Sequence, residues 1–189
     1  MMIDRRTVLL GSLSLALSGT FARAEAILTD DGLYKESWFL ESLLDLAEDL
    51  DGVQAQGKRF AVMWELRGCP YCRETHLVNF AQPRISDYVR SNFEVLQLNI
   101  IGARKVTDFD GQEMSEKSLA AKYGIRFTPT VQFFGEPSAR LKTLPPDKRE
   151  VARAPGYLRP DDFLALFRYV REKAYEGKSF REFLKSQPA

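Results

Sequence analysis

The feature that most constrains the fold of this chain is a short apolar run that leads directly into a pair of cysteines. Residues 60–66 read FAVMWEL, a composition typical of a strand buried on both faces. Two residues interrupt the run, and Cys69 and Cys72 follow with Pro70 between them. Proline is favoured in the first turn of a helix because its missing N–H has no partner there. The sequence therefore predicts a buried strand, a tight turn and a helix that begins at about residue 70.

Hydrophobic periodicity predicts further helices and strands on both sides of this unit. Apolar residues recur at steps of three and four over several stretches, and short apolar runs indicate two more strands. The expected helices cover residues 37–50, 70–80, 83–92, 115–123, 161–174 and 179–184, and the expected strands cover residues 60–66, 93–101 and 125–134. Strands that alternate with helices indicate one α/β domain whose first half has parallel strands.

Two connections carry turn signals. Within residues 102–114, Asp110 and Gly111 lie between polar arms, which predicts a small hairpin or an excursion loop. Residues 135–155 contain several prolines and charges, so we expect an exposed connection with part of a strand over residues 140–144. One of the two aspartates at positions 161 and 162 is expected to cap the helix that follows.

The first 24 residues have the pattern of an export signal. Arg5 and Arg6 precede an apolar run over residues 8–17 that is too short to cross a bilayer as a helix, and Ala22 and Ala24 offer a cleavage site. We expect cleavage there or two residues later, a mature domain that begins at residue 25, and a periplasmic location. The arginine pair suits both the twin-arginine and the general secretion route. No later stretch is apolar enough for a membrane span, so we expect no stable membrane insertion after cleavage.

Charge gives no indication of a nucleic-acid partner. The chain carries 27 basic and 26 acidic side chains, and removal of residues 1–24 takes away three arginines and one aspartate. The remainder is close to neutral and contains no basic run, whereas surfaces that bind nucleic acid are strongly basic. The function therefore has to be inferred from specific residues.

Cys69 and Cys72 are the only cysteines of the chain, and three roles compete for them. A structural disulfide across two intervening residues would remove little conformational entropy from the unfolded chain. A zinc site needs two further ligands, and the single histidine, His76, is the one remaining candidate of a common type. Redox chemistry fits better, because the dipole and free N–H groups at a helix N-terminus stabilise a thiolate. We expect Cys69 to attack a substrate disulfide and Cys72 to resolve the mixed disulfide.

Together with this cysteine turn, a second motif resembles the thioredoxin superfamily. Residues 127–130 read FTPT and open the last predicted strand, like the cis-proline loop of that superfamily, and the resemblance extends over residues 60–134. It implies a thioredoxin-like fold, with a central mixed sheet flanked by helices, an N-terminal helix, a loop insertion and a C-terminal helical extension. It also implies that Thr128 and Pro129 face the cysteines and bind an extended substrate segment. The alternative for Pro129 is an ordinary proline at a strand edge or bulge.

Within the superfamily, the chain is most similar to the periplasmic thioredoxins of sulfur-oxidation (Sox) gene clusters, on the basis of the segment WELRGCPYC, the preceding helix, the excursion at Asp110 and Gly111 and the helical tail. The resemblance implies a partner that carries sulfur on a cysteine. We expect a reductase of partner-protein disulfides that needs no bound cofactor. Its electron donor should be a membrane thiol reductase, because the periplasm has no thiol buffer of its own. The motif differs from the W-C-G-P-C centre of thioredoxins proper, which argues against the partners of ordinary cytosolic thioredoxins. Two alternatives to a reductase stay open. One is a disulfide oxidant or isomerase of the Dsb type, and the other is a non-catalytic, redox-sensitive binding or chaperone module.

Four residues near the cysteines are assigned functional roles, and three of them also have a structural interpretation. Thioredoxins carry an aspartate six residues before the first cysteine, where this chain has Met63. Glu65 lies on the same strand face, so we nominate it as a proton relay, although it would also suit a solvent-exposed strand end. Pro70 and Tyr71 are assigned to substrate binding, with packing on its own helix as the alternative for Tyr71. His76 lies one helical turn after the second cysteine, where it either tunes the thiols or is a partly buried, hydrogen-bonded histidine.

Overall fold

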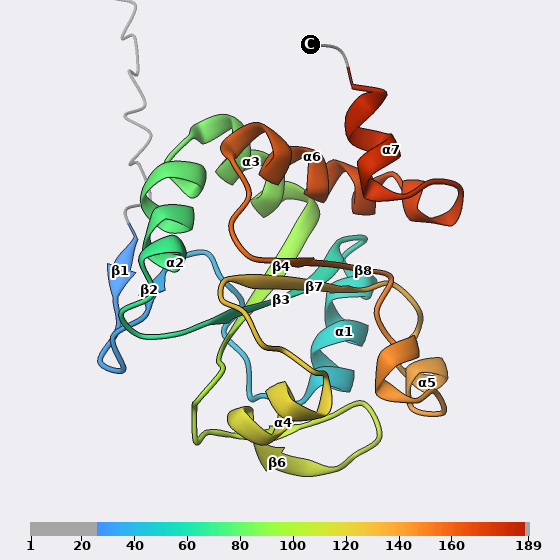
Figure 1. Ribbon diagram of the computed structural model, residues 1–189. Helices are drawn as coiled ribbons and strands as arrows, with labels where there is room; N and C mark the ends of the chain where they lie inside the picture. The colour runs from blue at the N-terminus through green and yellow to red at the C-terminus, as the bar shows by residue number, and fades with distance from the viewer. Residues whose placement is uncertain (1–25, 188–189) are drawn as a thin grey trace, which may run out of the picture.

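The computed structural model describes residues 26–187, which form a β-sheet flanked by helices (Figure 1). The predicted signal peptide lies outside the described residues, so its cleavage and the start of the mature domain stay predictions. The strands are β1 (Ile27–Leu28), β2 (Tyr34–Lys35), β3 (Arg59–Glu65), β4 (Phe93–Asn99), β5 (Lys105–Thr107), β6 (Glu113–Ser115), β7 (Thr130–Phe134) and β8 (Ala152–Pro155). The α-helices are α1 (Leu46–Ala55), α2 (Pro70–Glu74), α3 (Pro83–Asn92), α4 (Glu116–Lys122), α5 (Ser138–Leu141), α6 (Pro160–Arg171) and α7 (Phe180–Lys185). A π-helix, η1 (Thr75–Phe80), and two 3₁₀ turns, η2 (Pro146–Lys148) and η3 (Ala174–Glu176), complete the set.

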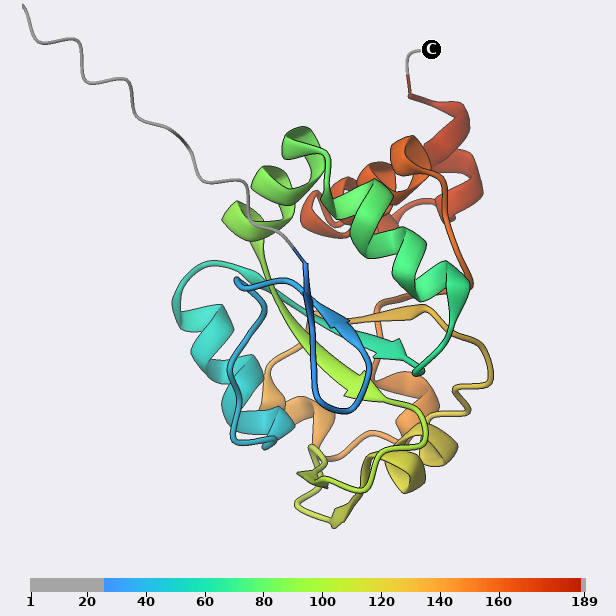
Figure 2. The same cartoon turned by 90° about the vertical axis from the view of Figure 1, so that its left-hand side faces the viewer.

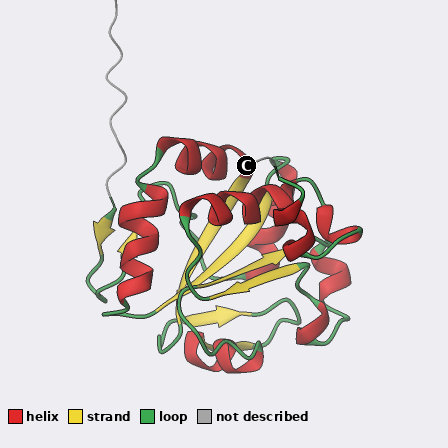
Figure 3. Cartoon of the chain, turned by 45° about the horizontal axis from the view of Figure 1, so that its top comes forward, coloured by secondary structure: helices red, strands yellow, loops and turns green. Residues whose placement is uncertain are grey.

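The central sheet has four strands in the order β4-β3-β7-β8. β3 pairs with β4 in parallel along its whole length, from Arg59 opposite Phe93 to Glu65 opposite Asn99. β7 runs antiparallel to both β3 and β8, so the second half of the sheet reverses direction. This topology confirms the expected α/β fold, in which a mixed sheet lies between helices and the first two long strands are parallel (Figure 3).

Two hydrophobic cores lie on opposite faces of the sheet. Side chains of β3 alternate between them, because Phe60, Val62 and Trp64 pack in one core and Ala61 and Met63 pack in the other. The first core contains residues of α1, α4 and the β5-β6 hairpin, and the second contains residues of η1, α3, α6 and α7. The next side chain of β3 on the second face is the carboxylate at position 65. The strand therefore directs an acidic group toward the helix that carries the cysteines.

An N-terminal hairpin that the hydrophobic pattern does not predict precedes the first helix. β1 and β2 pair antiparallel, with Ile27 opposite Lys35 and Leu28 opposite Tyr34. The hairpin lies beside α2 in Figure 1 and faces the viewer in Figure 2. Strands of two residues are too short to show an alternating pattern in the sequence. This explains why periodicity alone does not detect them.

The predicted N-terminal helix over residues 37–50 is wrong in its first half. α1 begins only at Leu46, because the carboxylate of Asp45 caps it by accepting hydrogen bonds from two backbone N–H groups of the first turn. Leu44, just before the cap, has a φ of 65°, which no right-handed helix contains. Phe39 instead packs edge-on against Phe80 of η1, with ring centroids 5.5 Å apart. The segment before α1 therefore covers the helix that follows the cysteines.

The connection over residues 135–155 also differs from the prediction. Residues 140–144 do not form a strand; α5 ends within them, and β8 is the strand that pairs with β7. The connection is not simply exposed, since Leu141 and Arg149 are buried. Arg149 donates a hydrogen bond to the buried carboxylate of Asp108 at 2.8 Å. That partner comes from a distant part of the chain, so local sequence patterns cannot indicate it.

The remaining elements agree with the prediction apart from their ends. The β5-β6 hairpin forms around Asp110 and Gly111 as expected. β7 begins at Thr130 rather than at residue 125. α6 begins at Pro160, and the two aspartates after it lie in the first turn instead of capping the helix. Carboxylates in a first turn are still favourable, because they lie near the positive end of the helix dipole.

Candidate active site

The cysteine turn follows directly on the end of β3. Gly68 has a φ of 77°, a backbone conformation that side chains disfavour, and Cys69 then forms the N-cap of α2. The sulfur of Cys69 accepts a hydrogen bond from the backbone N–H of Cys72 at 3.1 Å, and the two cysteines form a disulfide. Cys72 is only 4% exposed, whereas Cys69 is half-buried. The residue at the helix terminus is therefore the more accessible of the pair.

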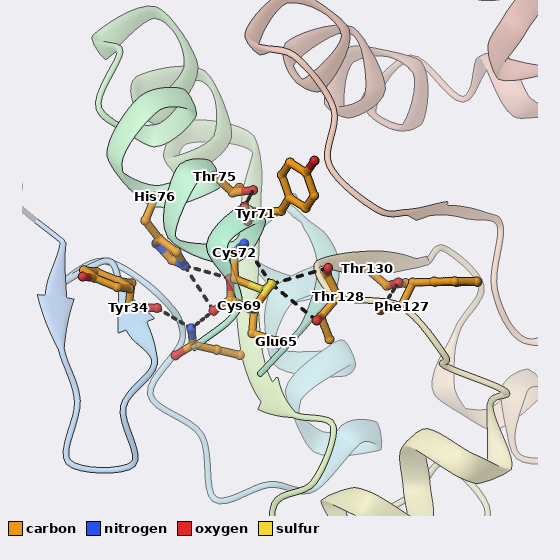
Figure 4. Close-up of a disulfide and its surroundings, with 11 residues drawn as sticks. Tyr34, Glu65, Cys69, Tyr71, Cys72, Thr75, His76, Phe127, Thr128 and Thr130 are labelled. Atoms are coloured by element: carbon orange, nitrogen blue, oxygen red, sulfur yellow. Dashed lines mark hydrogen bonds and ion pairs between the residues drawn. A yellow bond between two sulfur atoms is a disulfide. The ribbon is translucent and has the colours of Figure 1, made fainter. Parts of the chain in front are cut away.

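A loop from the other half of the chain lies against this disulfide. The carbonyl oxygen of Thr128 lies 3.5 Å from the Cys69 sulfur, and the Thr128 hydroxyl donates to the same sulfur at 3.5 Å. The peptide bond between Thr128 and Pro129 is cis. The Thr130 hydroxyl donates to the carbonyl of Phe127 at 2.7 Å, which closes the loop on itself. Figure 4 shows this loop to the right of the sulfurs, so the sequence-predicted cysteines and Thr128 are brought together.

Aromatic side chains border the accessible side of the disulfide. Tyr71, between the cysteines, is 56% exposed and stacks on Tyr157 from the β8-α6 loop, with ring centroids 5.7 Å apart. The Tyr157 hydroxyl donates to the side-chain oxygen of the buried Asn79 in η1 at 3.1 Å. Phe127 is 65% exposed on the loop described above, and Pro70 is exposed as well. Tyr71 therefore does not pack only on its own helix, and aromatic side chains from two further segments lie on the accessible side of the disulfide.

A cluster of charged side chains is buried on the other side of the disulfide. The ring of His76 lies between two carboxylates, with Nδ1 3.0 Å from Glu36 Oε1 and Nε2 3.0 Å from Glu65 Oε1. All three side chains are at most 2% exposed. The amide of Gln97 on β4 donates to Glu65 and, at 2.5 Å, to the carbonyl of Tyr34. Figure 4 shows His76 and Tyr34 to the left of the sulfurs, opposite the Thr128 loop.

The two carboxylates determine the protonation state of the histidine. Burial lowers the pKa of His76, but the charge of Glu65 and the hydrogen bonds to Glu36 and Glu65 outweigh burial and raise it to about 9. His76 is therefore an imidazolium at neutral pH, and both of its ring nitrogens donate to the carboxylates. Two carboxylates and one imidazolium leave the cluster with one uncompensated negative charge.

A pocket of about 380 Å³ joins this cluster to the disulfide. Its lining includes Glu65, Cys69 and Cys72 together with Leu33 and Tyr34 of the N-terminal hairpin. The hairpin turn packs closely on Arg67, because a Cβ atom at Gly32 would lie only 2.5 Å from its side chain. The carboxylate at the end of β3 and both sulfurs thus share one partly enclosed space.

The structure decides between the two interpretations of Glu65 and of His76, and it adds three residues to the site. Glu65 is fully buried, so its interpretation as a solvent-exposed strand end is wrong. His76 is buried and fully hydrogen-bonded, in line with the structural alternative, but its partner is the nominated relay itself. Glu36, Gln97 and Tyr157 were not indicated by any motif. Only Gln97 had a usable signal, since it is a polar residue inside the apolar strand VLQLN.

Within residues 26–187, no group of three or more His, Cys, Asp or Glu side chains has an arrangement suited to a metal ion. In the same part of the chain, no helix has the length and apolar character that crossing a membrane requires.

Comparison with protein families supplies the classification. Residues 46–171, more than half of the chain, match a family described as "thioredoxin-like domain". The chain belongs to the thioredoxin-like domain family. The matched region contains the cysteine turn, the Thr128 loop and the four-stranded sheet. The N-terminal hairpin and Glu36 precede it.

Solved structures give the same fold. A thioredoxin-fold protein from Helicobacter pylori is similar to this chain with a TM-score of 0.59 and 18% sequence identity, over 78% of this chain and 86% of that one. A thioredoxin from Thermus thermophilus shares 24% identity over 69% of this chain and 88% of its own, with a TM-score of 0.48. No match was found among curated protein sequences. At these identities the first likeness establishes the thioredoxin fold alone.

Proposed function

We propose that the protein is a periplasmic thiol-disulfide oxidoreductase that reduces disulfides of partner proteins through Cys69 and Cys72. The observation that carries the proposal is the position of Cys69. Its sulfur lies at a helix N-terminus, 3.5 Å from the carbonyl of Thr128, while Cys72 is buried behind it. A thiolate at a helix N-terminus is stabilised by N–H groups and by the dipole, which favours attack by this sulfur.

The exchange proceeds in two steps. The Cys69 thiolate attacks one sulfur of the partner disulfide, forms a mixed disulfide, and the other partner sulfur leaves as a thiolate that takes a proton from solvent. The thiol of Cys72 then gives its proton to the carboxylate of Glu65, and the resulting thiolate attacks the Cys69 sulfur. The Cys69–Cys72 disulfide forms, the second partner sulfur leaves, and two electrons have passed to the partner. Glu65 suits this role because it lines the same pocket as both cysteines.

The substrate segment is bound on the aromatic side of the disulfide. An extended peptide beside Thr128 would place its own cysteine next to Cys69 by pairing with the backbone of the loop. Pro129 has no N–H that could compete for the carbonyls of that peptide. Pro70, Tyr71 and Phe127 offer exposed apolar surface on either side of the peptide.

The physiological setting follows from the N-terminal sequence and from the resemblance to Sox thioredoxins. An export signal would deliver the protein to the periplasm, where the oxidised form has to be reduced again by a membrane thiol reductase. The sulfur-oxidation link implies a partner with a cysteine that carries sulfur and that this protein keeps reduced. No bound cofactor is required, because the two cysteines themselves store the electrons.

A trapping experiment tests the proposal. Cys72→Ala should leave mixed disulfides with partner proteins unresolved, so that a covalent complex through Cys69 accumulates in periplasmic extracts. The matched control, Cys69→Ala, should capture nothing. Absence of any complex that depends on Cys69 would contradict exchange chemistry.

The reduction potential separates the reductase from an oxidant of the Dsb type. A value near −270 mV, as for thioredoxin, is expected from equilibration with glutathione, whereas a value near −120 mV would indicate an oxidant. A Cys69→Ser variant that keeps full function would instead support a non-catalytic binding module.

A further inference from the structure

The carboxylate that faces the disulfide pocket is held by groups from three different parts of the chain. Gln97 of β4 and His76 of η1 both donate to Glu65. His76 is held in turn by Glu36, which follows β2, at 3.0 Å. Both oxygens of Glu65 are within hydrogen-bonding distance of the same ring nitrogen, at 3.0 and 3.2 Å. The position of this carboxylate is therefore fixed by the hairpin segment as well as by the sheet.

The segment that supplies Glu36 lies outside the region that matches the thioredoxin-like family. That region starts at residue 46, whereas β1, β2 and Glu36 come before it. A carboxylate that is 2% exposed and paired with a buried imidazolium is costly to keep unless its partners are well placed. The hairpin segment therefore adds a charge to the site beyond the apolar cover that it provides.

We propose that Glu36 and His76 are positioning residues for the redox reaction: together they orient Glu65 toward Cys72 and set the net charge of the pocket beneath the disulfide. This inference rests on the proposed function. His76 is the link, since one of its ring nitrogens contacts Glu36 and the other contacts Glu65. Because the cluster keeps one surplus negative charge, it is able to accept one proton when Cys72 ionises. It returns that proton when Cys72 leaves as a thiolate during reduction of the disulfide.

Among residues 26–187, the structure pairs His76 with no charged side chain other than the carboxylates of Glu36 and Glu65. β3 contributes Glu65 and the residue after β2 contributes Glu36. The other neighbours are aromatic rings, with centroids 6.4 Å away for Tyr34, 5.7 Å for Phe39 and 5.7 Å for Phe80 of η1 itself. Arg73 of α2 lines the adjoining pocket. The charge of the cluster is therefore controlled by three side chains, of which only Glu65 lines the disulfide pocket.

Titration of Cys72 alone tests this inference. In a Cys69→Ala background, thiolate absorbance at 240 nm reports the ionisation of the single remaining cysteine. Glu36→Gln keeps the shape of the side chain and removes the surplus charge, so the midpoint of Cys72 ionisation should fall to lower pH, with about tenfold more thiolate at a given pH. Glu36→Asp, which keeps the charge, should restore most of the original midpoint.

The matched control is Glu41→Gln in the same N-terminal segment. Glu41 is 84% exposed and pairs with Lys35 at the surface, so its loss changes the net charge of the protein equally but should leave the midpoint unchanged. If Glu36→Gln gives the same midpoint as Glu41→Gln while circular dichroism shows a native fold, Glu36 has no role in the redox site and the inference is overturned.

A second measurement needs no substitution in the cluster and so does not depend on the folding of a variant. His76 is the only histidine of the chain, so in protein without a histidine tag its ring signals in NMR are unambiguous. In the dithiol form, the ring signals should shift as Cys72 ionises, and the ring should titrate near pH 9 rather than near 6.5. A ring that titrates near 6.5, or that does not respond to Cys72, would overturn the inference.

The titrations of Cys72 and His76 can fail or succeed independently of the trapping experiment that tests the proposed function. The titrations need no partner protein, so they succeed or fail whether or not a substrate is trapped. If the protein captures no partner but Glu36, His76 and Cys72 are coupled, the inference about the charged site stands and the proposed reductase role is contradicted. If the protein captures partners but shows no such coupling, the reductase role stands and the inference about Glu36 and His76 is contradicted.

Discussion

Two ionic clusters of the molecule, one partly and one fully buried, differ in their charge balance. In the first, Asp108 and Asp110 of the β5-β6 hairpin pair with Lys122 of α4 and with Arg149, at distances of 2.5 to 3.0 Å. The Tyr123 hydroxyl adds a hydrogen bond to Asp108 at 2.8 Å. Two negative and two positive charges cancel there. The second cluster, around His76, has two carboxylates and a single cation.

The difference indicates what each cluster does. The balanced cluster connects the β5-β6 hairpin, α4 and the segment before β8. It explains why Arg149 is buried although the prolines and charges of residues 135–155 predict an exposed connection. Balanced ion pairs of this kind help to fix one arrangement of the chain. The unbalanced cluster retains a negative charge in the wall of the disulfide pocket. An uncompensated buried charge that costs stability is better explained by chemistry than by packing.

Arg149→Met gives the largest expected effect. It removes a buried cation and leaves the carboxylate of Asp108 with one cationic partner fewer, so the free energy of unfolding should fall by about 3–5 kcal/mol. Urea denaturation measures this loss. The ionisation of Cys72 in the folded variant should not change, because the balanced cluster does not line the disulfide pocket. A changed midpoint for Cys72 would contradict the division of roles between the clusters.

The pH dependence of stability should show the two clusters at opposite ends of the scale. Since the pKa of His76 is raised to about 9 in the folded protein, its contribution is fully present below pH 6.5 and is lost as pH rises through 9, on the order of 3 kcal/mol in total. Burial raises the pKa of Asp110, but hydrogen bonds from Lys122 and Arg149 outweigh burial and lower it to about 2. Its contribution is present above pH 3.8 and is lost as pH falls through 2.

Urea denaturation between pH 2 and pH 10 separates the loss of stability at alkaline pH from the loss at acid pH. His76→Gln should abolish the alkaline loss and leave the acid loss, and Asp110→Asn should weaken the acid loss and leave the alkaline one. A His76→Gln protein whose stability still falls between pH 6.5 and pH 9 would show that the imidazolium is not the group responsible.

Glu65→Gln should affect the reaction more than the fold. The amide can still hydrogen-bond within the cluster, but it cannot accept the proton of Cys72. Loss of a local proton acceptor should slow release of the second partner sulfur about a hundredfold at pH 7, and this loss should outweigh the easier ionisation of the thiol. Rapid mixing of the reduced protein with a chromogenic aromatic disulfide measures the step, with Glu41→Gln as the control. An unchanged rate would exclude Glu65 as the acceptor.

Tyr123→Phe gives the smallest expected effect. It deletes a hydroxyl that donates to Asp108 and accepts from Arg149 at 3.1 Å. The free energy of unfolding should fall by about 1 kcal/mol, the usual contribution of one buried hydrogen bond in a network that stays satisfied otherwise. Thermal denaturation followed by circular dichroism measures it. A loss as large as that of Arg149→Met would show that the hydroxyl, and not the ion pairs, holds the balanced cluster together.

The sequence predicts the parts of this molecule that depend on local patterns. The buried strand, the cysteine turn and the loop of Thr128 and Pro129 are readable because each has a characteristic run of residue types. Glu65 was found through the alternation of β3, which places it on the face of Met63. Glu36 was not found, because its place in the site depends on a contact with His76, which lies forty residues later in the chain. The hairpin that carries it has strands too short for any periodic signal.

The most direct test of the central claim is the reaction of the reduced protein with oxidised glutathione, followed by mass spectrometry. The unsubstituted protein should end as the Cys69–Cys72 disulfide with no glutathione attached. Cys72→Ala should stop with one glutathione on Cys69, and Cys69→Ala should stay unmodified on the same timescale. If Cys72 acquires the glutathione instead, or if neither cysteine reacts, the assignment of Cys69 as the attacking sulfur of an oxidoreductase is contradicted.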